Sequence, residues 1–280
     1  MMARSAEKRG ASPRTRRFRG RHGRQVESRA KALEDKLKRI LADQVEDLVD
    51  EAVRGLGKRT LVKKRLSKTE QRMLTLLTHY GLMQIRDGGR GIAEGKFLIT
   101  PQFERGFLAQ NKILVQELSS NVRQAFRDGM QRAFVEWRSE DPKPGVREIA
   151  RRLRMGQLTD SDKWSDNDKR FLKPLSTSTS IHGLASRART IARTEIGRAR
   201  NAGRVEGMRL AGFTHHKWSS YSDIHSRRGH AKMNGQIRLI GEPFDNPETG
   251  EELEFPGDPS AKPSETINCR CTVVPTIVKS

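Results

Sequence analysis

The sequence has few cysteines, few aromatic residues and no long apolar segment. Its 280 residues include only two cysteines, Cys269 and Cys271. Alternate positions of a strand lie about 7 Å apart, beyond the usual bridging distance, so this pair excludes a secreted disulfide scaffold and favours a reducing compartment. No run of about 18 uncharged apolar residues occurs, and the first thirty residues lack the apolar centre of a signal peptide. We therefore expect no membrane span and no classical export.

Positive charge is abundant and unevenly spread. The chain carries 55 Lys and Arg against 34 Asp and Glu, a formal net charge of +21. Such a charge implies nucleic acid or a strongly acidic protein surface as a partner. The first thirty residues are especially basic and have few large apolar side chains, so we expect residues 1–26 to form a disordered arm. We expect this arm to bind double-stranded DNA without sequence preference, and a solubilising or targeting tail is the alternative. The proposed DNA-binding residues are Arg14, Arg16, Arg17, Arg19, Arg21 and Arg24.

Residues 27–155 are predicted to be a helical region. Apolar residues at steps of three and four predict one long amphipathic helix over residues 27–53 and another over 101–137. Between them, Ser67 and Glu70 form a capping box that starts a further helix. The glycines that follow Gly81 favour a small β-hairpin or an exposed loop. We expect these helices to pack on one another, with a coiled-coil partner as the alternative.

The rest of the chain is predicted to be a polar linker or insertion over residues 156–184 and an α+β domain over 185–280. A helix over 185–211 carries a small apolar stripe, and Arg193 and Glu195 within it are candidates for a buried polar anchor. Short strands follow, and Asn234-Gly235 is a strong hairpin signal. The predicted fold class is thus α+β, a helical N-terminal region joined to one helix packed on a small sheet.

An ordered set of motifs in this domain resembles the phage Mu protein F-like family, the head-morphogenesis minor capsid proteins of tailed phages. The resemblance covers about Arg187 to Thr276. It rests on the following residues, which we expect to be structural rather than catalytic: Ala192, Arg193, Thr194, Glu195, Trp218, Asp223, Arg227, His230, Asn234, Gly235, Gln236, Phe244, Pro256, Gly257, Asp258, Pro259, Asn268, Cys269, Arg270 and Cys271.

The resemblance implies a minor capsid protein of a tailed phage or prophage, needed for correct head assembly and for DNA packaging or delivery. Its implied partners are the portal protein, a scaffold or major capsid protein, and double-stranded DNA, with no membrane. Its implied location is the virion, in the capsid interior or at the portal vertex, and the host cytoplasm during assembly. We expect no enzymatic activity and no cofactor, and we expect the helices over 27–53 and 101–137 to make the protein contacts.

Two chemical interpretations compete with this one. Asp223, His230, Cys269 and Cys271 offer four zinc-ligating side chains, although their spacing matches no recognised zinc finger. Alternatively, the two cysteines are small buried hydrophobes and the other two residues hydrogen-bond to loop backbone.

A metal-dependent nuclease or other DNA-acting enzyme is the alternative function. It is disfavoured because Asn234 is predicted to lie in a hairpin turn and no helix follows to carry the last histidine. Its candidate residues are His215, His216, Asp223, His225, His230 and Asn234. For the architectural role we expect instead one polar network of Glu195, Asp223, Arg227, His230 and Asn268, joining the helix, the loop and the last strand.

Overall fold

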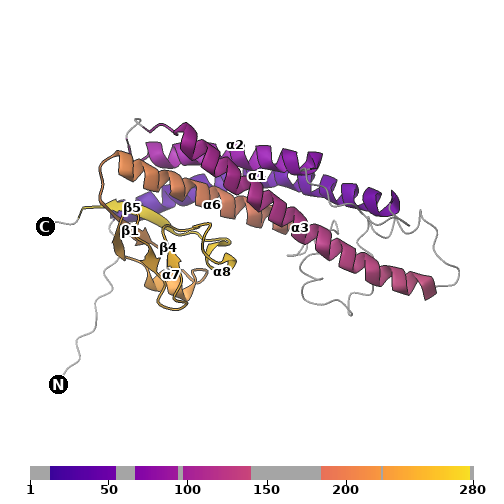
Figure 1. Ribbon diagram of the computed structural model, residues 1–280. Coiled ribbons are helices and arrows are strands. Elements are labelled where there is room, and N and C mark those ends of the chain that lie inside the picture. The colour runs from indigo at the N-terminus through magenta and orange to yellow at the C-terminus, as the bar shows by residue number, and fades with distance from the viewer. Residues whose placement is uncertain (1–12, 55–66, 94–96, 140–183, 222, 278–280) are drawn as a thin grey trace, which may run out of the picture.

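The chain combines long helices with a small antiparallel β-structure, so the predicted mixture of α and β is confirmed (Figure 1). The structure is a computed structural model that describes residues 13–54, 67–93, 97–139, 184–221 and 223–277. Residues 156–183 of the predicted linker lie outside these ranges. The long helices are α1 (Pro13–Arg54), α2 (Lys68–Arg90), α3 (Pro101–Ser139) and α6 (Leu184–Leu210).

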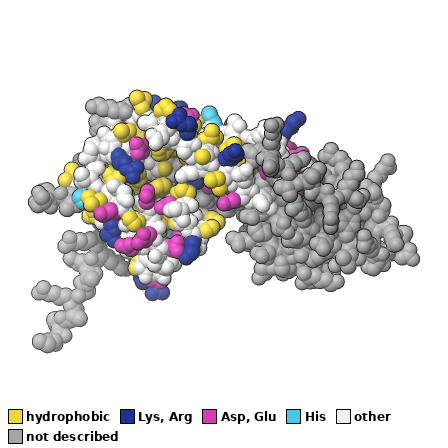
Figure 2. Space-filling model, viewed as in Figure 1, with side chains coloured by type: hydrophobic (Ala, Val, Ile, Leu, Met, Phe, Trp, Pro, Cys, Tyr) yellow, Lys and Arg dark blue, Asp and Glu magenta, His cyan; other side chains and the backbone are white. Residues whose placement is uncertain are grey.

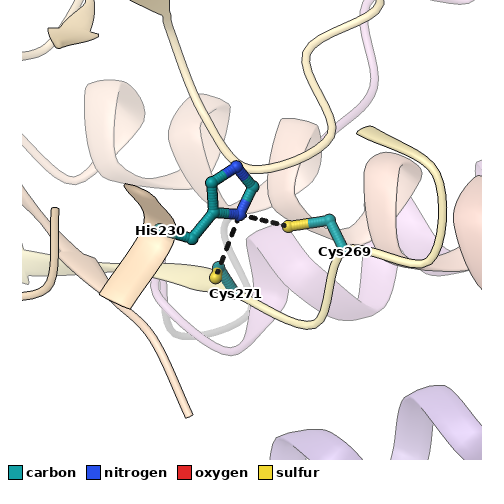
Figure 3. A group of neighbouring side chains, drawn as sticks. All are labelled: His230, Cys269 and Cys271. Atoms are coloured by element: carbon teal, nitrogen blue, oxygen red, sulfur yellow. Dashed lines mark hydrogen bonds between the residues drawn. The ribbon is translucent and has the colours of Figure 1, made fainter. Parts of the chain in front are cut away.

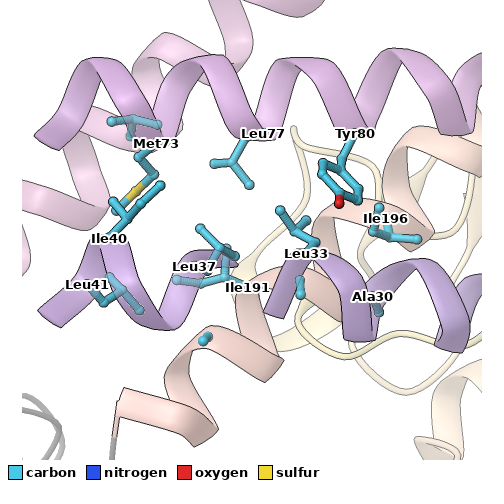
Figure 4. Close-up of a cluster of buried hydrophobic side chains, with 13 residues drawn as sticks. Ala30, Leu33, Leu37, Ile40, Leu41, Met73, Leu77, Tyr80, Ile191 and Ile196 are labelled. Carbon is cyan, nitrogen blue, oxygen red and sulfur yellow. The ribbon is translucent and has the colours of Figure 1, made fainter. Parts of the chain in front are cut away.

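Helices α1, α2 and α6 enclose one apolar core, shown in Figure 4. The steps of three and four along α1 place its apolar side chains in one stripe, which turns inward because burial removes that stripe from water. Side chains of α2 point toward this stripe, and α6 supplies the third wall. The buried members include Leu33, Leu37, Ile40 and Leu41 of α1, Met73, Leu77 and Tyr80 of α2, and Ala188, Ile191, Ala192 and Ile196 of α6.

The predicted capping box is confirmed at the start of α2. The Ser67 hydroxyl accepts a hydrogen bond from the Glu70 backbone N–H, and the Glu70 carboxylate accepts one from the Ser67 N–H. The predicted hairpin or loop after Gly81 is wrong, because α2 continues as a helix to Arg90.

The glycines inside α2 and α6 allow close helix contact instead of making turns. A Cβ on Gly88 would lie 2.3 Å from the carbonyl oxygen of Arg200, and one on Gly203 would lie 2.2 Å from that of Ile85. The Cα of Gly89 would lie 2.8 Å from a Cβ on Gly207. Two glycines on each helix therefore let the two backbones approach more closely than any side chain would permit, which offsets the low helix propensity of glycine.

The C-terminal part of the chain packs a small β-structure against the end of α6 (Figure 1). A three-stranded antiparallel sheet has the order β2-β1-β5, and β3 pairs with β4 in a separate antiparallel ladder. Trp218, Phe244 and Val273 are buried between these strands and Val205 and Met208 of α6. The bounds are His215–Ser219 for β1, Ile237–Leu239 for β2, Phe244–Asp245 for β3, Glu252–Leu253 for β4 and Thr272–Thr276 for β5, with short helices α7 (Arg228–Lys232) and α8 (Pro263–Thr266).

Two further predictions differ from the structure. Helix α1 begins at Pro13, so residues 13–26 of the predicted disordered arm are helical, and residues 1–12 lie outside the described ranges. Asn234-Gly235 does not join two strands, because α7 precedes it and β2 follows. Only Gly235 of this pair has a positive φ, and the Asn234 amide oxygen accepts a hydrogen bond from the Ser220 N–H.

Substituting Gly203 tests the close contact between α2 and α6. We expect Gly203→Ala to lower the free energy of unfolding by at least about 2 kcal/mol, because the added methyl forces the backbones apart. Gly106 is the matched control: it lies in α3 with nothing within 4 Å of an added Cβ. Gly106→Ala should stabilise the chain by about 0.5–1 kcal/mol through helix propensity. Urea unfolding followed by circular dichroism measures both, and equal effects would contradict the contact.

Candidate functional site

Three of the side chains singled out as zinc ligands meet in the C-terminal part of the chain (Figure 3). His230 comes from α7, and Cys269 and Cys271 come from the segment between α8 and β5. The His230 Nδ1 lies 3.5 Å from the Cys269 Sγ and 3.7 Å from the Cys271 Sγ. His230 is 1% exposed and Cys271 6%, so these two are screened from bulk water, whereas Cys269 is half-buried. Both cysteines are free thiols.

The other ring nitrogen of His230 is held by a buried carboxylate. His230 Nε2 lies 2.9 Å from Glu265 Oε2, and the same oxygen accepts a hydrogen bond of 2.9 Å from the Asn246 side-chain amide. Because a carboxylate only accepts, Nε2 carries a proton, so in the neutral ring Nδ1 faces the sulfurs with its lone pair. The edge of the Trp218 ring packs against the imidazole, at 5.3 Å between centroids. Glu265 and Asn246 thus fix both the ring plane and the tautomer of His230.

The close contacts shift the pKa values of all three groups. A hydrogen bond with Cys271, and then one with His230, hold the pKa of the Cys269 thiol well below its ordinary value despite burial. The hydrogen bond with Cys269 and burial raise the pKa of Cys271 well above its ordinary value. Burial alone would lower the pKa of His230, but its hydrogen bonds with Cys269 and Glu265 raise it. The group therefore favours one thiolate, the form in which cysteine acts as a nucleophile or a metal ligand.

Helix α6 holds the cysteine segment through buried polar side chains. The Asn201 amide donates to the carbonyl oxygens of Pro256, at 3.0 Å, and of Cys271, at 3.1 Å, and its oxygen accepts from the Thr272 hydroxyl at 2.9 Å. Arg204 Nε donates to the Val273 carbonyl at 2.8 Å. Burial lowers the pKa of Arg204 to about 9, so its guanidinium stays charged at neutral pH. These bonds fix the backbone of Cys271 relative to α6.

Asp223 does not belong to the cysteine–histidine group, which corrects the predicted four-ligand set. It lies on the surface, where its Oδ1 accepts a hydrogen bond of 2.5 Å from the Arg270 guanidinium and another from the His225 N–H. These bonds, that with Arg270 above all, lower the pKa of Asp223. Because the Asp223 carboxylate is paired with Arg270, it is not available as a metal ligand.

The single polar network predicted from the sequence is also wrong. Its members divide among separate contacts: Arg227 donates to the Ile267 carbonyl at 2.5 Å, and the Asn268 N–H donates to the Thr194 hydroxyl at 3.0 Å. Asn268 has a φ of 56°, the left-handed conformation that asparagine tolerates, where the chain turns before Cys269.

Glu195 and Arg193 have different environments within α6. Glu195 pairs with Arg198 at 2.6 Å, and Arg198 in turn donates to the Asn111 side chain of α3 at 2.8 Å. Burial raises the pKa of Glu195 although Arg198 opposes it. Arg193 is exposed and Glu195 is partly buried, so of the two residues proposed as a buried anchor only Glu195 is screened from water.

Pro256, Gly257 and Asp258 form a buried turn beside α6. Gly257 has a φ of 87°, and a Cβ there would lie 3.2 Å from the Cα of Arg198. The Asp258 carboxylate accepts hydrogen bonds from the backbone N–H groups of Glu254, at 2.8 Å, and Ser260, at 2.9 Å. This motif is therefore structural in the described part of the chain: it closes a turn and lets the turn approach the helix.

Four residues that complete the site were not among the sequence predictions: Asn201, Arg204, Asn246 and Glu265. The contact that places each of them in the site is with a segment at least 19 positions away. A local sequence pattern therefore could not predict these contacts. The local signal for Arg204 was weak, because α6 contains six other arginines.

The histidines proposed for a nuclease are not assembled in the described ranges. There, the group able to hold a metal consists of His230, Cys269 and Cys271, and it excludes His215, His216 and His225. His216 packs instead against the Phe244 ring, at 4.6 Å between centroids, and burial lowers its pKa to about 4. The residues proposed for DNA binding lie on the first turns of α1, where positions 14, 17, 21 and 24 recur at steps of three and four along one stripe.

The fold and the site together define a helical bundle that carries a small α+β unit with a buried histidine–cysteine group. Residues 145–274 match the family described as Phage Mu protein F like protein, which confirms the resemblance drawn from the motifs. This segment of the chain is similar to that family, and the similarity suggests a phage head morphogenesis protein associated with the virion or its assembly. It begins well before Arg187 and includes the segment interpreted as a linker or insertion.

The other comparisons add no relative. Neither the search of curated proteins nor the search of solved structures found a match. Among the described residues, no helix combines the length and the apolar character needed to cross a bilayer.

Substitution of Asn201 tests how α6 holds the cysteine segment. We expect Asn201→Ala to lower the free energy of unfolding by about 3 kcal/mol, because it leaves two buried carbonyl oxygens and the Thr272 hydroxyl without their partner. Gln110, exposed on α3, is the control, and Gln110→Ala should change stability by less than about 0.5 kcal/mol. Thermal and urea unfolding of the full chain measure both, and a harmless Asn201→Ala would show that these bonds contribute little.

Proposed function

We propose that this protein is a non-enzymatic minor head protein that sits at the portal vertex of a tailed phage and contacts both the portal and the packaged DNA. The match of residues 145–274 to the Mu F-like family carries the proposal. The charge and the arrangement of the helices support its two contacts.

The DNA contact is proposed for the basic start of α1. Ten of the first thirty residues are Lys or Arg, whereas the face shown in Figure 2 intersperses charges of both signs among hydrophobic side chains. Several arginines of α6 are also unavailable for DNA, because Arg198, Arg200 and Arg204 are buried against other parts of the chain. The N-terminal segment therefore offers the densest positive charge, and phosphate contacts of this kind carry no sequence information.

Neutralising the basic start of α1 tests the DNA contact. We expect replacement of Arg14, Arg16, Arg17, Arg19, Arg21 and Arg24 by Gln to weaken binding to duplex DNA. The plot of log affinity against log salt concentration should become less steep, its negative slope shrinking in magnitude by up to about five, because each phosphate contact releases about 0.9 of a counterion. Fluorescence anisotropy across a salt series measures the slope.

The control variant removes the same charge elsewhere. It replaces six exposed cations of the bundle by Gln: Arg39, Lys68, Arg86, Arg90, Arg105 and Lys112. Equal losses in the two variants would show that net charge, and not the N-terminal segment, attracts DNA. The duplex should be recovered intact from the same mixtures after incubation with Mg²⁺ or Zn²⁺. Cleavage by the full chain would contradict a non-enzymatic role and favour the nuclease.

The portal contact is proposed for α3 rather than for both long helices. The apolar stripe of α1 is already covered by α2 and α6, so it is not free to bind a partner. Helix α3 instead projects beyond the other helices (Figure 1). It exposes Leu108 and Ile113, 43% and 56% accessible, and Leu98 just before it is 76% accessible.

Removing exposed aliphatic side chains from α3 tests this assignment. We expect the double variant Leu108→Ser, Ile113→Ser to reduce co-purification of the portal protein by at least about tenfold, since two buried aliphatic side chains contribute a few kcal/mol to an interface. The matched control changes two exposed isoleucines outside the bundle, Ile224→Ser and Ile277→Ser. Binding is measured at physiological salt, where the Debye length is near 8 Å, so that nonspecific attraction is screened. If only the control variant failed to co-purify the portal protein, the portal contact would lie on the C-terminal unit instead of α3.

A further inference from the structure

We propose that His230, Cys269 and Cys271 bind one zinc ion, which ties α7 to the segment that leads into β5, with a non-protein ligand in the fourth position. The proposal concerns a site separate from the DNA and portal contacts and does not depend on them. It replaces the four-ligand set drawn from the sequence, because Asp223 is paired with Arg270 at the surface.

The distances between the ligand atoms are those of a tetrahedral zinc site. Zinc binds sulfur at about 2.3 Å and imidazole nitrogen at about 2.0–2.1 Å, so tetrahedral angles place nitrogen and sulfur about 3.6 Å apart. The two separations from His230 Nδ1 are 3.5 Å and 3.7 Å, and all three ligand atoms lie within 4.8 Å of one another (Figure 3). Both separations from the nitrogen therefore match a tetrahedral zinc site.

The contacts are harder to explain as ordinary hydrogen bonds. Nδ1 of a neutral imidazole has a single lone pair in the ring plane, so it accepts one strong hydrogen bond and not two. Here two sulfur atoms converge on that one nitrogen. A cation on the lone pair satisfies both sulfurs and the nitrogen at once.

The surroundings of His230 are those of a metal ligand. Metal-bound histidines generally donate their second N–H to a carboxylate, which fixes the tautomer and makes the ring a better ligand. Glu265 has this position, and Asn246 holds Glu265 in place through the same carboxylate oxygen. Two thiolates would neutralise the double charge of the zinc, which suits a site next to the buried rings of Trp218 and Phe244.

A reactive thiol is the alternative use of the same side chains. Cys269, His230 and Glu265 also form the order of nucleophile, base and orienting carboxylate found in cysteine enzymes. In that arrangement Cys271 serves only as a hydrogen-bond partner of Cys269, although its own thiol lies on the same nitrogen and α6 fixes its backbone. The two uses predict opposite responses to a chelator.

The first test measures metal in the full chain, purified under reducing conditions from cells supplied with zinc. We expect about one zinc per chain by mass spectrometry of the metal, and a strong chelator should remove it and lower the melting temperature. Cobalt added to the chelated chain should give the ultraviolet charge-transfer band of thiolate–cobalt bonds. A chain that binds neither ion, or that keeps its melting temperature after chelation, overturns the proposal.

The second test follows alkylation of the two cysteines by iodoacetamide in the unaltered chain, so it does not depend on whether variants fold. Bound zinc should protect both thiols, and chelation should speed the modification of Cys269 at least about tenfold, as its deprotonated thiol becomes free. Rapid modification of Cys269 that the chelator leaves unchanged would show a free reactive thiolate and overturn the zinc site.

Variants separate the ligands from their neighbours. Cys269→Ser and Cys271→Ser should abolish stoichiometric zinc. Glu265→Gln should weaken zinc binding about 10–100-fold, as loss of a supporting carboxylate does in other sites. Asp223→Asn and His225→Asn are the matched controls, since both residues are exposed and outside the group, and both variants should retain zinc. Loss of zinc in Asp223→Asn would contradict the three-ligand set and restore the four-ligand one.

Discussion

Helix α6 has to complete three apolar clusters along its length, and the rest of the structure depends on how it does so. Its first half, including Ile191 and Ile196, closes the core shared with α1 and α2. Its middle, at Ala199, contacts the cluster where α2 meets the start of α3. Its last turns, with Val205 and Met208, support the C-terminal strands. Glycines at Gly203 and Gly207 keep the α2 backbone close enough for one helix to serve all three.

The buried arginines of α6, Arg198, Arg200 and Arg204, are compatible with this burial because each has an oxygen partner. Arg198 has both Glu195 and the Asn111 side chain, and Arg204 has the Val273 carbonyl. Burying a guanidinium without such partners would cost several kcal/mol. Because the partners must stay within hydrogen-bonding distance, these contacts also fix the orientation of α6. The net charge of +21 therefore overstates what the protein presents to a polyanion.

The helices could be predicted from the sequence because their signals are local. The capping box at Ser67 and Glu70 and the apolar stripe of α1 are read from residues three or four positions apart. The glycines of α2 could not be interpreted in the same way, since glycine serves equally for a turn and for close backbone contact. Which of the two applies depends on α6, more than a hundred positions later.

Only part of the candidate site could be predicted from the sequence. The family motifs identified His230, Cys269 and Cys271, and the structure brings these three together. They did not show that Asp223 pairs with Arg270 or that Glu265 supports the histidine, because those contacts depend on where loops meet in three dimensions.

The shared core of α1, α2 and α6 also affects the order in which the chain can fold during synthesis. Its members lie at residues 30–41, 73–80, 115 and 188–196, so the ribosome releases the members from α1, α2 and α3 long before those from α6. Contacts so distant in sequence form slowly, and apolar surface stays uncovered until they do. Until α6 has been synthesised, the earlier helices therefore present an apolar surface that the finished chain conceals, and a chaperone or an assembling head can bind it during this interval.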